Sequence, residues 1–214
     1  MSDWIAEISS AVKGHRAFFE WLVEHMRPST IVELGVDRGY STFVFAEALA
    51  KNNQKDNINL VSAVYGIDWF EGDVSSGYRN TLDEVNENIQ KHNLQHIKII
   101  KGDFNEIAKA WSRGIDILFI DGSHDYESVK RDFENWSQFV KPNGIILMHD
   151  IDVPNFGVRK YYDQITGYMK LEFNHSYGLG ILTRDIELHR RIKIIVELIK
   201  NSLSNLYLDV DANA

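Results

Sequence analysis

The chain contains no cysteine, which excludes disulfide bonds, thiolate nucleophiles and zinc–thiolate sites. No apolar stretch is long enough to span a bilayer, and the first residues lack the basic and then apolar pattern of a signal peptide. We therefore expect a cytoplasmic protein that has no membrane partner.

Positive charge is also scarce. Lys and Arg total 23 against 31 Asp and Glu, which gives a formal net charge of −8, and no basic run carries interleaved aromatic residues. Excess negative charge repels phosphate backbones, so we expect no nucleic-acid partner. A length of 214 residues with 44% hydrophobic side chains is typical of one globular domain with small appendages.

The stretch at residues 30–41 organises the rest of the chain. A short apolar run ends at Glu33, Gly35 and Gly39 follow, and Ser41 opens an apolar pattern at helical spacing. This order predicts a buried strand, a tight turn and a helix. Glycine tolerates positive φ and lets a ligand lie against the backbone, so the turn is typical of a nucleotide-cofactor site.

The spacing of the residues within this turn narrows the choice of cofactor. Val36 and Asp37 follow Gly35, so the second glycine of a dinucleotide fingerprint is missing, and no P-loop lysine is present. The remaining pattern is E-x-G-x-x-x-G-x-S. A carboxylate on Glu33 would repel phosphates but suits a cofactor with an ammonium or sulfonium group. The alternative is an ordinary strand-to-helix turn.

At this motif the chain resembles the class I S-adenosylmethionine-dependent methyltransferases. The resemblance implies that Glu33 faces the methionine end of the cofactor. It also implies that the turn contacts the cofactor through Gly35, Asp37, Gly39 and Ser41.

Two further strands end in acidic residues. The apolar run at residues 60–68 ends in Asp68, which can accept hydrogen bonds from both ribose hydroxyls, and Trp69 could give the adenine an aromatic face. A solvated aspartate and a packing tryptophan are the alternatives. The strand at residues 97–100 leads to Asp103 and Phe104. The resemblance implies that Asp103 contacts the adenine; helix N-capping is the rival role.

The clearest buried strand runs over residues 115–121 and ends in Asp121, and the next, at residues 145–148, leads to His149 and Asp150. Strands alternate with helical segments throughout, which predicts a doubly wound, Rossmann-like α/β sheet with helices on both faces. It also predicts that these acids lie at one edge with Glu33 and Asp68. The resemblance implies an antiparallel last strand.

The segment Asp-Gly-Ser-His-Asp-Tyr from Asp121 and the later pair His149-Asp150 are more specific than the glycine turn. With them, residues 30–183 resemble the small-molecule O-methyltransferases of the macrocin and cephalosporin-pathway types. In metal-dependent relatives such acids bind a divalent cation, which implies Asp121, His149 and Asp150 as ligands of Mg²⁺ or a similar ion. His149 replaces an acid there, and histidine ligates magnesium poorly.

A metal-free site is therefore the alternative, with His124 or His149 as the base. These residues and Asp121 are our candidate catalytic groups. We predict transfer of a methyl group from S-adenosylmethionine to a hydroxyl of a small molecule, such as a sugar or natural product. The rival functions are a non-catalytic binding module and, less favoured, a nicotinamide-dependent oxidoreductase.

We divide the chain into an N-terminal helical segment at residues 1–28, a cofactor-binding domain at residues 29–184, and a C-terminal helix and tail at residues 185–214. The C-terminal segment is amphipathic. It could fold back on the domain or form a homodimer.

Overall fold

The computed structural model describes residues 3–56, 62–72 and 77–211, with side chains as far as residue 199. The strands form one sheet in the order β3-β2-β1-β4-β5-β7-β6. They are β1 (Thr30–Leu34), β2 (Ala63–Asp68), β3 (Ile97–Lys101), β4 (Ile115–Ile120), β5 (Val140–His149), β6 (Met169–Phe173) and β7 (Leu179–Thr183).

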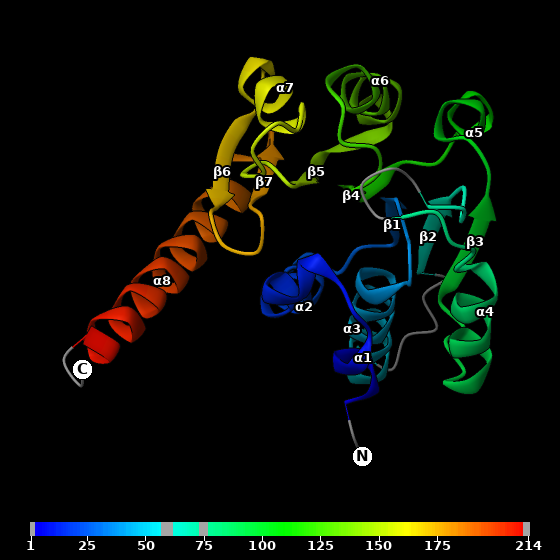
Figure 1. Ribbon diagram of the computed structural model, residues 1–214, viewed down its shortest axis with the longest axis horizontal. Helices are drawn as coiled ribbons and strands as arrows, with labels where there is room; N and C mark the ends of the chain where they lie inside the picture. The colour runs from blue at the N-terminus through cyan, green and yellow to red at the C-terminus, as the bar shows by residue number, and fades with distance from the viewer. Residues whose placement is uncertain (1–2, 57–61, 73–76, 212–214) are drawn as a thin grey trace.

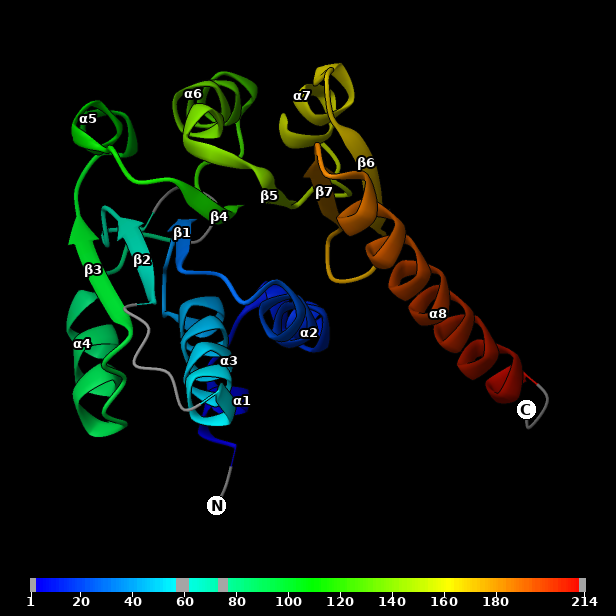
Figure 2. The ribbon, with the colours of Figure 1, turned by 180° about the vertical axis from the view of Figure 1, so that it is seen from behind.

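Helices cover both faces of this sheet (Figure 1). On one face lie α1 (Trp4–Glu7), α2 (Arg16–Met26), α3 (Tyr40–Asp56) and α4 (Leu82–Lys91); on the other lie α5 (Phe104–Ala110), α6 (Tyr126–Trp136) and α7 (Val158–Gln164). The view from behind shows the same two layers (Figure 2). The 3₁₀ helices are η1 (Ala11–His15) and η2 (Ser137–Phe139), and α8 (Ile186–Asp211) closes the described chain.

The sheet is mostly parallel. Strand β1 pairs in parallel with β2 and β4, and these pair in parallel with β3 and β5, whereas β7 lies antiparallel between β5 and β6. This arrangement confirms the expected Rossmann-like fold with an antiparallel last strand. The chain leaves β1 toward β2 on one side and returns to β4 on the other, which is where such sheets open a crevice for ligands.

The central strands are apolar because both of their faces are buried. Every residue of β1 is buried, and neighbouring residues of β4 serve opposite cores. Phe119 packs with Phe45 of α3 on one face, and Leu118 lies in the same core cluster as Trp136 of α6 on the other. The two-sided burial holds the ends of β1 and β4 in fixed register.

Residues 141–144 form a bulge in β5, not the turn that their Lys-Pro-Asn-Gly sequence predicts. Ile115 pairs with Val140, but Ile117 pairs with Ile145, so the extra residues belong to β5 alone. Pro142 can stand there because it is exposed and needs no ladder hydrogen bond.

The first helical segment is interrupted, although its apolar spacing suggests a continuous pattern. Helix α1 ends at Glu7, the Ser10 hydroxyl accepts from the Val12 N–H, and η1 then leads into α2. The polar composition of residues 51–59 is typical of a loop, but α3 continues through Asp56, and the remaining residues lie outside those described.

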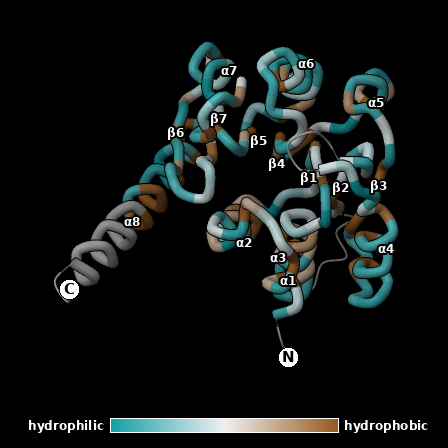
Figure 3. The backbone as a smooth tube through the Cα atoms, in the orientation of Figure 1, coloured by the Kyte–Doolittle hydropathy of each residue, from teal (hydrophilic) through white to brown (hydrophobic). Residues whose placement is uncertain are grey.

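Helix α8 packs against β6 and β7 by its first turns. Ile192 and Val196 are buried in the core, while Ile194 and Leu198 are more than half exposed. Hydrophilic and hydrophobic segments alternate along the coloured part of this helix (Figure 3). No described helix combines the length and apolarity needed to cross a membrane.

Asp116 lies at the edge of the sheet where the parallel strands begin, and its carboxylate connects three segments of the chain there. One carboxylate oxygen of Asp116 accepts from the Ser29 and Thr30 N–H groups and the Ser29 hydroxyl, each at 2.9 Å. The other lies 2.7 Å from the Lys141 ammonium. The carboxylate therefore joins the chain entering β1 to β4 and to the bulge in β5.

Replacing Asp116 with alanine should lower the free energy of unfolding by about 2–3 kcal/mol, because two backbone donors and a hydroxyl lose a charged acceptor. Urea denaturation at neutral pH measures the change. Lys141→Ala is the control and should cost below about 1 kcal/mol, since the ammonium is partly exposed. Equal losses in the two variants would contradict this account.

Candidate active site

A cleft of about 340 Å³ opens at the carboxyl ends of β1, β2, β4 and β5. Asp68, Asp121 and Asp150 line it together with the turn after β1. Three of the four strand-end acids thus converge on one cavity. Glu33 is the exception.

Glycine is required at position 35 by both conformation and space. Its φ is +96°, and a Cβ there would lie 2.0 Å from the carbonyl oxygen of Asp121. The Asp121 N–H donates to the Leu34 carbonyl at 2.8 Å. The backbone after β1 therefore lies directly against the backbone after β4, with Gly39 at φ +84° completing the turn.

Asp68 holds this turn from the neighbouring strand. Its Oδ2 accepts from the N–H groups of Val36 at 2.7 Å and Asp37 at 2.9 Å. Its Oδ1 accepts from the Phe70 N–H at 2.6 Å. The Asp37 carboxylate, which also lines the cleft, pairs with the Arg79 guanidinium at 2.7 Å.

Glu33 lies beneath the cleft and is fully buried. The hydroxyls of Ser41 and Thr42 donate to its two oxygens. Burial raises the pKa of Glu33 to about 8, with the Asp121 and Asp68 charges adding to the rise and the two hydroxyls opposing it. Glu33 is not among the residues that line the cleft. Ser41 does line the cleft.

The predicted adenine-side residues all line the cleft but differ in exposure. Trp69 is about half exposed, and its indole N–H donates to Glu71. Asp103 is exposed, and its Oδ1 accepts from the N–H groups of Asn105 and Glu106 at 2.8 and 3.1 Å. It therefore caps the N-terminus of α5, which was the alternative role. Phe104 follows as the first residue of α5.

At the other end of the cleft, two histidines contact the Asp121 and Asp150 carboxylates. His124 Nε2 lies 2.8 Å from Asp150 Oδ2, and its ring stacks on Phe156 at 4.4 Å between centroids. His149 Nδ1 lies 3.2 Å from both Asp121 Oδ1 and Asp150 Oδ1. These contacts hold the pKa of the Asp150 carboxyl below its usual range, against the effect of burial.

His149 has the most deeply buried side chain of these four residues. Its other ring nitrogen, Nε2, donates to the Ser176 carbonyl at 2.9 Å, and its side chain is nearly fully buried. Burial lowers the pKa of His149, but the Asp121 and Asp150 carboxylates outweigh it and raise that pKa to about 10. His149 thus contacts both carboxylates, and its roles as a metal ligand and as a base stay predictions.

His124 takes its place in the candidate metal-binding group. Asp121, His124 and Asp150 each offer one ligand atom, and these atoms lie within 4.8 Å of one another. Two carboxylate oxygens and an imidazole nitrogen fit a divalent first-row ion better than an all-oxygen magnesium site. The same residues also form a base with an orienting acid, because Asp150 bonds to His124.

Several residues that line the cleft were not predicted from the sequence. The break after α1 brings residues 9–11 to the cleft, and α6 contributes Ser128, Arg131 and Asp132. The positions on α6 follow helical spacing, which could have placed them on one face. No sequence signal marked residues 9–11.

Comparison with known proteins agrees with this architecture. Residues 32–151, more than half of the chain, match the family model described as a methyltransferase domain. The chain belongs to this family.

Two curated relatives are longer than the matched region. The uncharacterised protein y4gI of Sinorhizobium fredii is 33% identical over 180 residues, covering 81% of this chain and 19% of the relative. The uncharacterised protein R132 of Acanthamoeba polyphaga mimivirus is 34% identical over 125 residues, covering 56% and 51%. The chain thus matches about a fifth of the first relative and about half of the second.

Solved structures share the fold at low identity. A putative caffeoyl-CoA O-methyltransferase from Staphylococcus aureus has a TM-score of 0.63 at 18% identity, covering 84% of this chain and 87% of that one. TomG from Streptomyces achromogenes, an O-methyltransferase in complex with SAM, gives 0.61 at 14%, covering 86% and 90%. The Bacillus cereus O-methyltransferase in complex with SAH gives 0.59 at 19%, covering 82% of each.

Glu33→Gln should change how stability depends on pH. The folded state keeps a proton on Glu33 up to about pH 8, whereas an unfolded glutamate releases it near its ordinary value of 4.5. This contribution to stability is full below the unfolded pKa and is lost as pH rises through the folded one. From about pH 5 to 8, Glu33→Gln should therefore gain stability relative to the wild type.

Urea denaturation across this pH range measures the difference. Glu87→Gln, on an exposed position of α4, is the matched control and should follow the wild type. Parallel stability curves for Glu33→Gln and the wild type would show that Glu33 does not hold its proton in the folded state.

Proposed function

We propose that the chain binds S-adenosylmethionine in the cleft and transfers its methyl group to a hydroxyl of a small molecule. The observation that carries the proposal is the convergence of the β1 turn, Asp68 and Asp121 on one cavity, in a chain of the methyltransferase-domain family. TomG and the Bacillus cereus O-methyltransferase, which share the fold, were solved with SAM and SAH.

The cofactor's ribose would lie at Asp68. Three backbone N–H groups already donate to Asp68, two to Oδ2 and one to Oδ1, and because a carboxylate has about four acceptor sites, Oδ1 can still accept one ribose hydroxyl. The methionine portion would lie along the β1 turn, where Gly35, Val36 and Asp37 line the cleft. Trp69 and Phe104, both at the cleft, provide apolar surface for the base.

The acceptor hydroxyl would lie near Asp121, His124 and Asp150. Methyl transfer to oxygen needs donor and acceptor in line and the acceptor deprotonated. A divalent ion held by these residues would lower the pKa of a bound hydroxyl. Without an ion, His124 accepts the proton while Asp150 orients the ring and stabilises its positive charge.

Calorimetric titration with S-adenosylhomocysteine tests the cofactor assignment. The wild type should bind, and Asp68→Ala should weaken binding at least about tenfold, because the ribose acceptor is lost and the turn is released. Glu24→Ala, in an exposed ion pair with Lys55 away from the cleft, is the control and should stay within about twofold. A wild-type chain that gives no heat at about 1 mM would refute the proposed function.

Titration with Mn²⁺, followed by electron paramagnetic resonance, separates the two routes to the acceptor. If a metal is used, the wild type binds one ion and Asp150→Ala weakens this binding at least about tenfold. Asp125→Asn, a capping residue of α6 outside the ligand group, should bind as the wild type does. A wild type that fails to bind Mn²⁺ at about 1 mM excludes the metal route and leaves His124 as the base.

Labelled cofactor and a panel of hydroxylated sugars and natural products, with product mass spectrometry, would then identify the acceptor. His124→Ala should lower the rate about 10²-fold or more by either route.

A further inference from the structure

The proposed function depends on the direction in which the His124 imidazole points. Its Nε2 lies 2.8 Å from Asp150 Oδ2, at one edge of the ring. The χ2 angle of a histidine side chain has broad minima, so a contact at one edge does not fix the plane of the ring. The plane is fixed only where another group packs against a face of the imidazole.

Phe156, in the loop between β5 and α7, packs against one of these faces. The two ring centroids lie 4.4 Å apart and the ring planes differ by 10°, so the rings are stacked nearly in parallel. Phe156 is partly buried against the core that also contains residues of α6 and α7. Among the described residues, those that line the cleft do not include it. Phe156 therefore faces the cleft only through His124.

Backbone contacts fix the position of Phe156 relative to His124. The next residue, Gly157, donates its N–H to the His124 carbonyl at 2.7 Å. A Cβ on Gly157 would lie 2.1 Å from the Tyr126 nitrogen, so this close approach requires glycine. The Phe156 N–H donates to the Val153 carbonyl at 3.3 Å, which closes the loop immediately before the aromatic ring.

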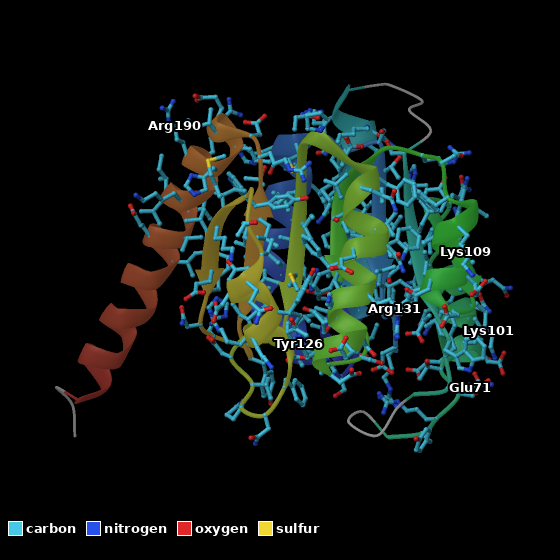
Figure 4. The ribbon with its side chains drawn as sticks, turned by 90° about the horizontal axis from the view of Figure 1, so that it is seen from above. Glu71, Lys101, Lys109, Tyr126, Arg131 and Arg190 are labelled. Atoms are coloured by element: carbon cyan, nitrogen blue, oxygen red, sulfur yellow. The ribbon has the colours of Figure 1, made fainter. Side chains whose placement is uncertain are left out.

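Side chains of α6 and α7 join the same two segments. The Tyr126 hydroxyl donates to the Gln164 side chain at 2.6 Å, and the Tyr126 ring meets the Tyr161 ring edge-on at 5.8 Å between centroids. Figure 4 shows Tyr126 at the end of α6, on the side toward α7. The loop before α7 and the turn after β4 are therefore joined as one unit, which keeps Phe156 and His124 in register.

We propose that Phe156 is a positioning residue for methyl transfer, whose ring fixes the plane of the His124 imidazole at the acceptor end of the cleft. The inference rests on the proposed function, because it concerns the residue that acts there by either route. A metal ligand and a base share one requirement, since each must hold a ring nitrogen in a fixed direction. Phe156→Leu keeps much of the apolar volume without the flat surface, whereas Phe156→Tyr keeps both.

Long-range proton–nitrogen NMR of the histidine side chains, recorded on the chain without ligand, tests the contact. His124→Gln identifies the His124 signals. Phe156→Leu should displace the ring-nitrogen shifts of His124 and broaden its signals, because the imidazole then samples several orientations. Phe156→Tyr should leave both close to those of the wild type.

Phe139→Leu is the matched control for these spectra. Phe139 is also partly buried against the same core, but it packs on Trp136, at the other end of α6. This variant should keep the wild-type signals of His124. Thermal unfolding verifies that each variant is folded.

Steady-state kinetics with the acceptor found by the panel tests the consequence for the reaction. Phe156→Leu should lower kcat at least about tenfold while the KM values for cofactor and acceptor stay within about twofold, because the reacting group is misdirected and the binding surfaces are unchanged. Phe156→Tyr should keep kcat within about twofold of the wild type. A role in folding alone would not separate kcat from KM in this way.

The inference is overturned if Phe156→Leu keeps the wild-type His124 signals, if Phe139→Leu changes them as much, or if Phe156→Leu keeps the wild-type kcat. A wild type that does not bind S-adenosylhomocysteine refutes the proposed function instead. The spectra need no cofactor or acceptor, so they still decide in that case whether Phe156 fixes the His124 ring.

Discussion

The two hydrogen bonds from the Val36 and Asp37 N–H groups to the Asp68 carboxylate determine the shape of the cleft. Charge-assisted bonds of this kind are about twice as strong as neutral ones. They hold the β1 turn against the end of β2, while the missing Cβ of Gly35 lets the same turn touch the backbone of Asp121. The ends of β1, β2 and β4 are therefore held together, and these contacts position the side chains that follow them.

The acids around the cleft are kept close together by three different means. Glu33 is buried with two hydroxyl partners and its pKa is raised, so it is mostly uncharged at neutral pH. Asp68 is surrounded by backbone donors. Asp121 and Asp150 share the buried positive charge of His149. Without these differences, mutual repulsion in a partly desolvated cavity would oppose folding.

The sequence predicts the sheet well because burial on both faces forces apolar strands, and parallel pairing forces their carboxyl ends to one edge. Asp68, Asp121 and Asp150 lie there as expected. The sequence predicted that Glu33 lies at the end of a strand, but it did not predict that the side chain is buried. The buried position depends on Ser41 and Thr42 of α3, whose hydroxyls donate to the Glu33 carboxylate. The bulge in β5 was missed for a related reason, since Lys-Pro-Asn-Gly favours a turn in isolation.

The different contacts of the two histidines could not be predicted from the sequence. His124 and His149 both follow apolar strands and both contact Asp150, so local pattern cannot separate their roles. The distinction comes from the loop between β6 and β7, where the Ser176 carbonyl accepts from His149 Nε2. That acceptor fixes a proton on Nε2, and the two carboxylates at Nδ1 raise the pKa of the ring to about 10. A backbone group 27 residues away thus sets the orientation of His149 and distinguishes it from His124.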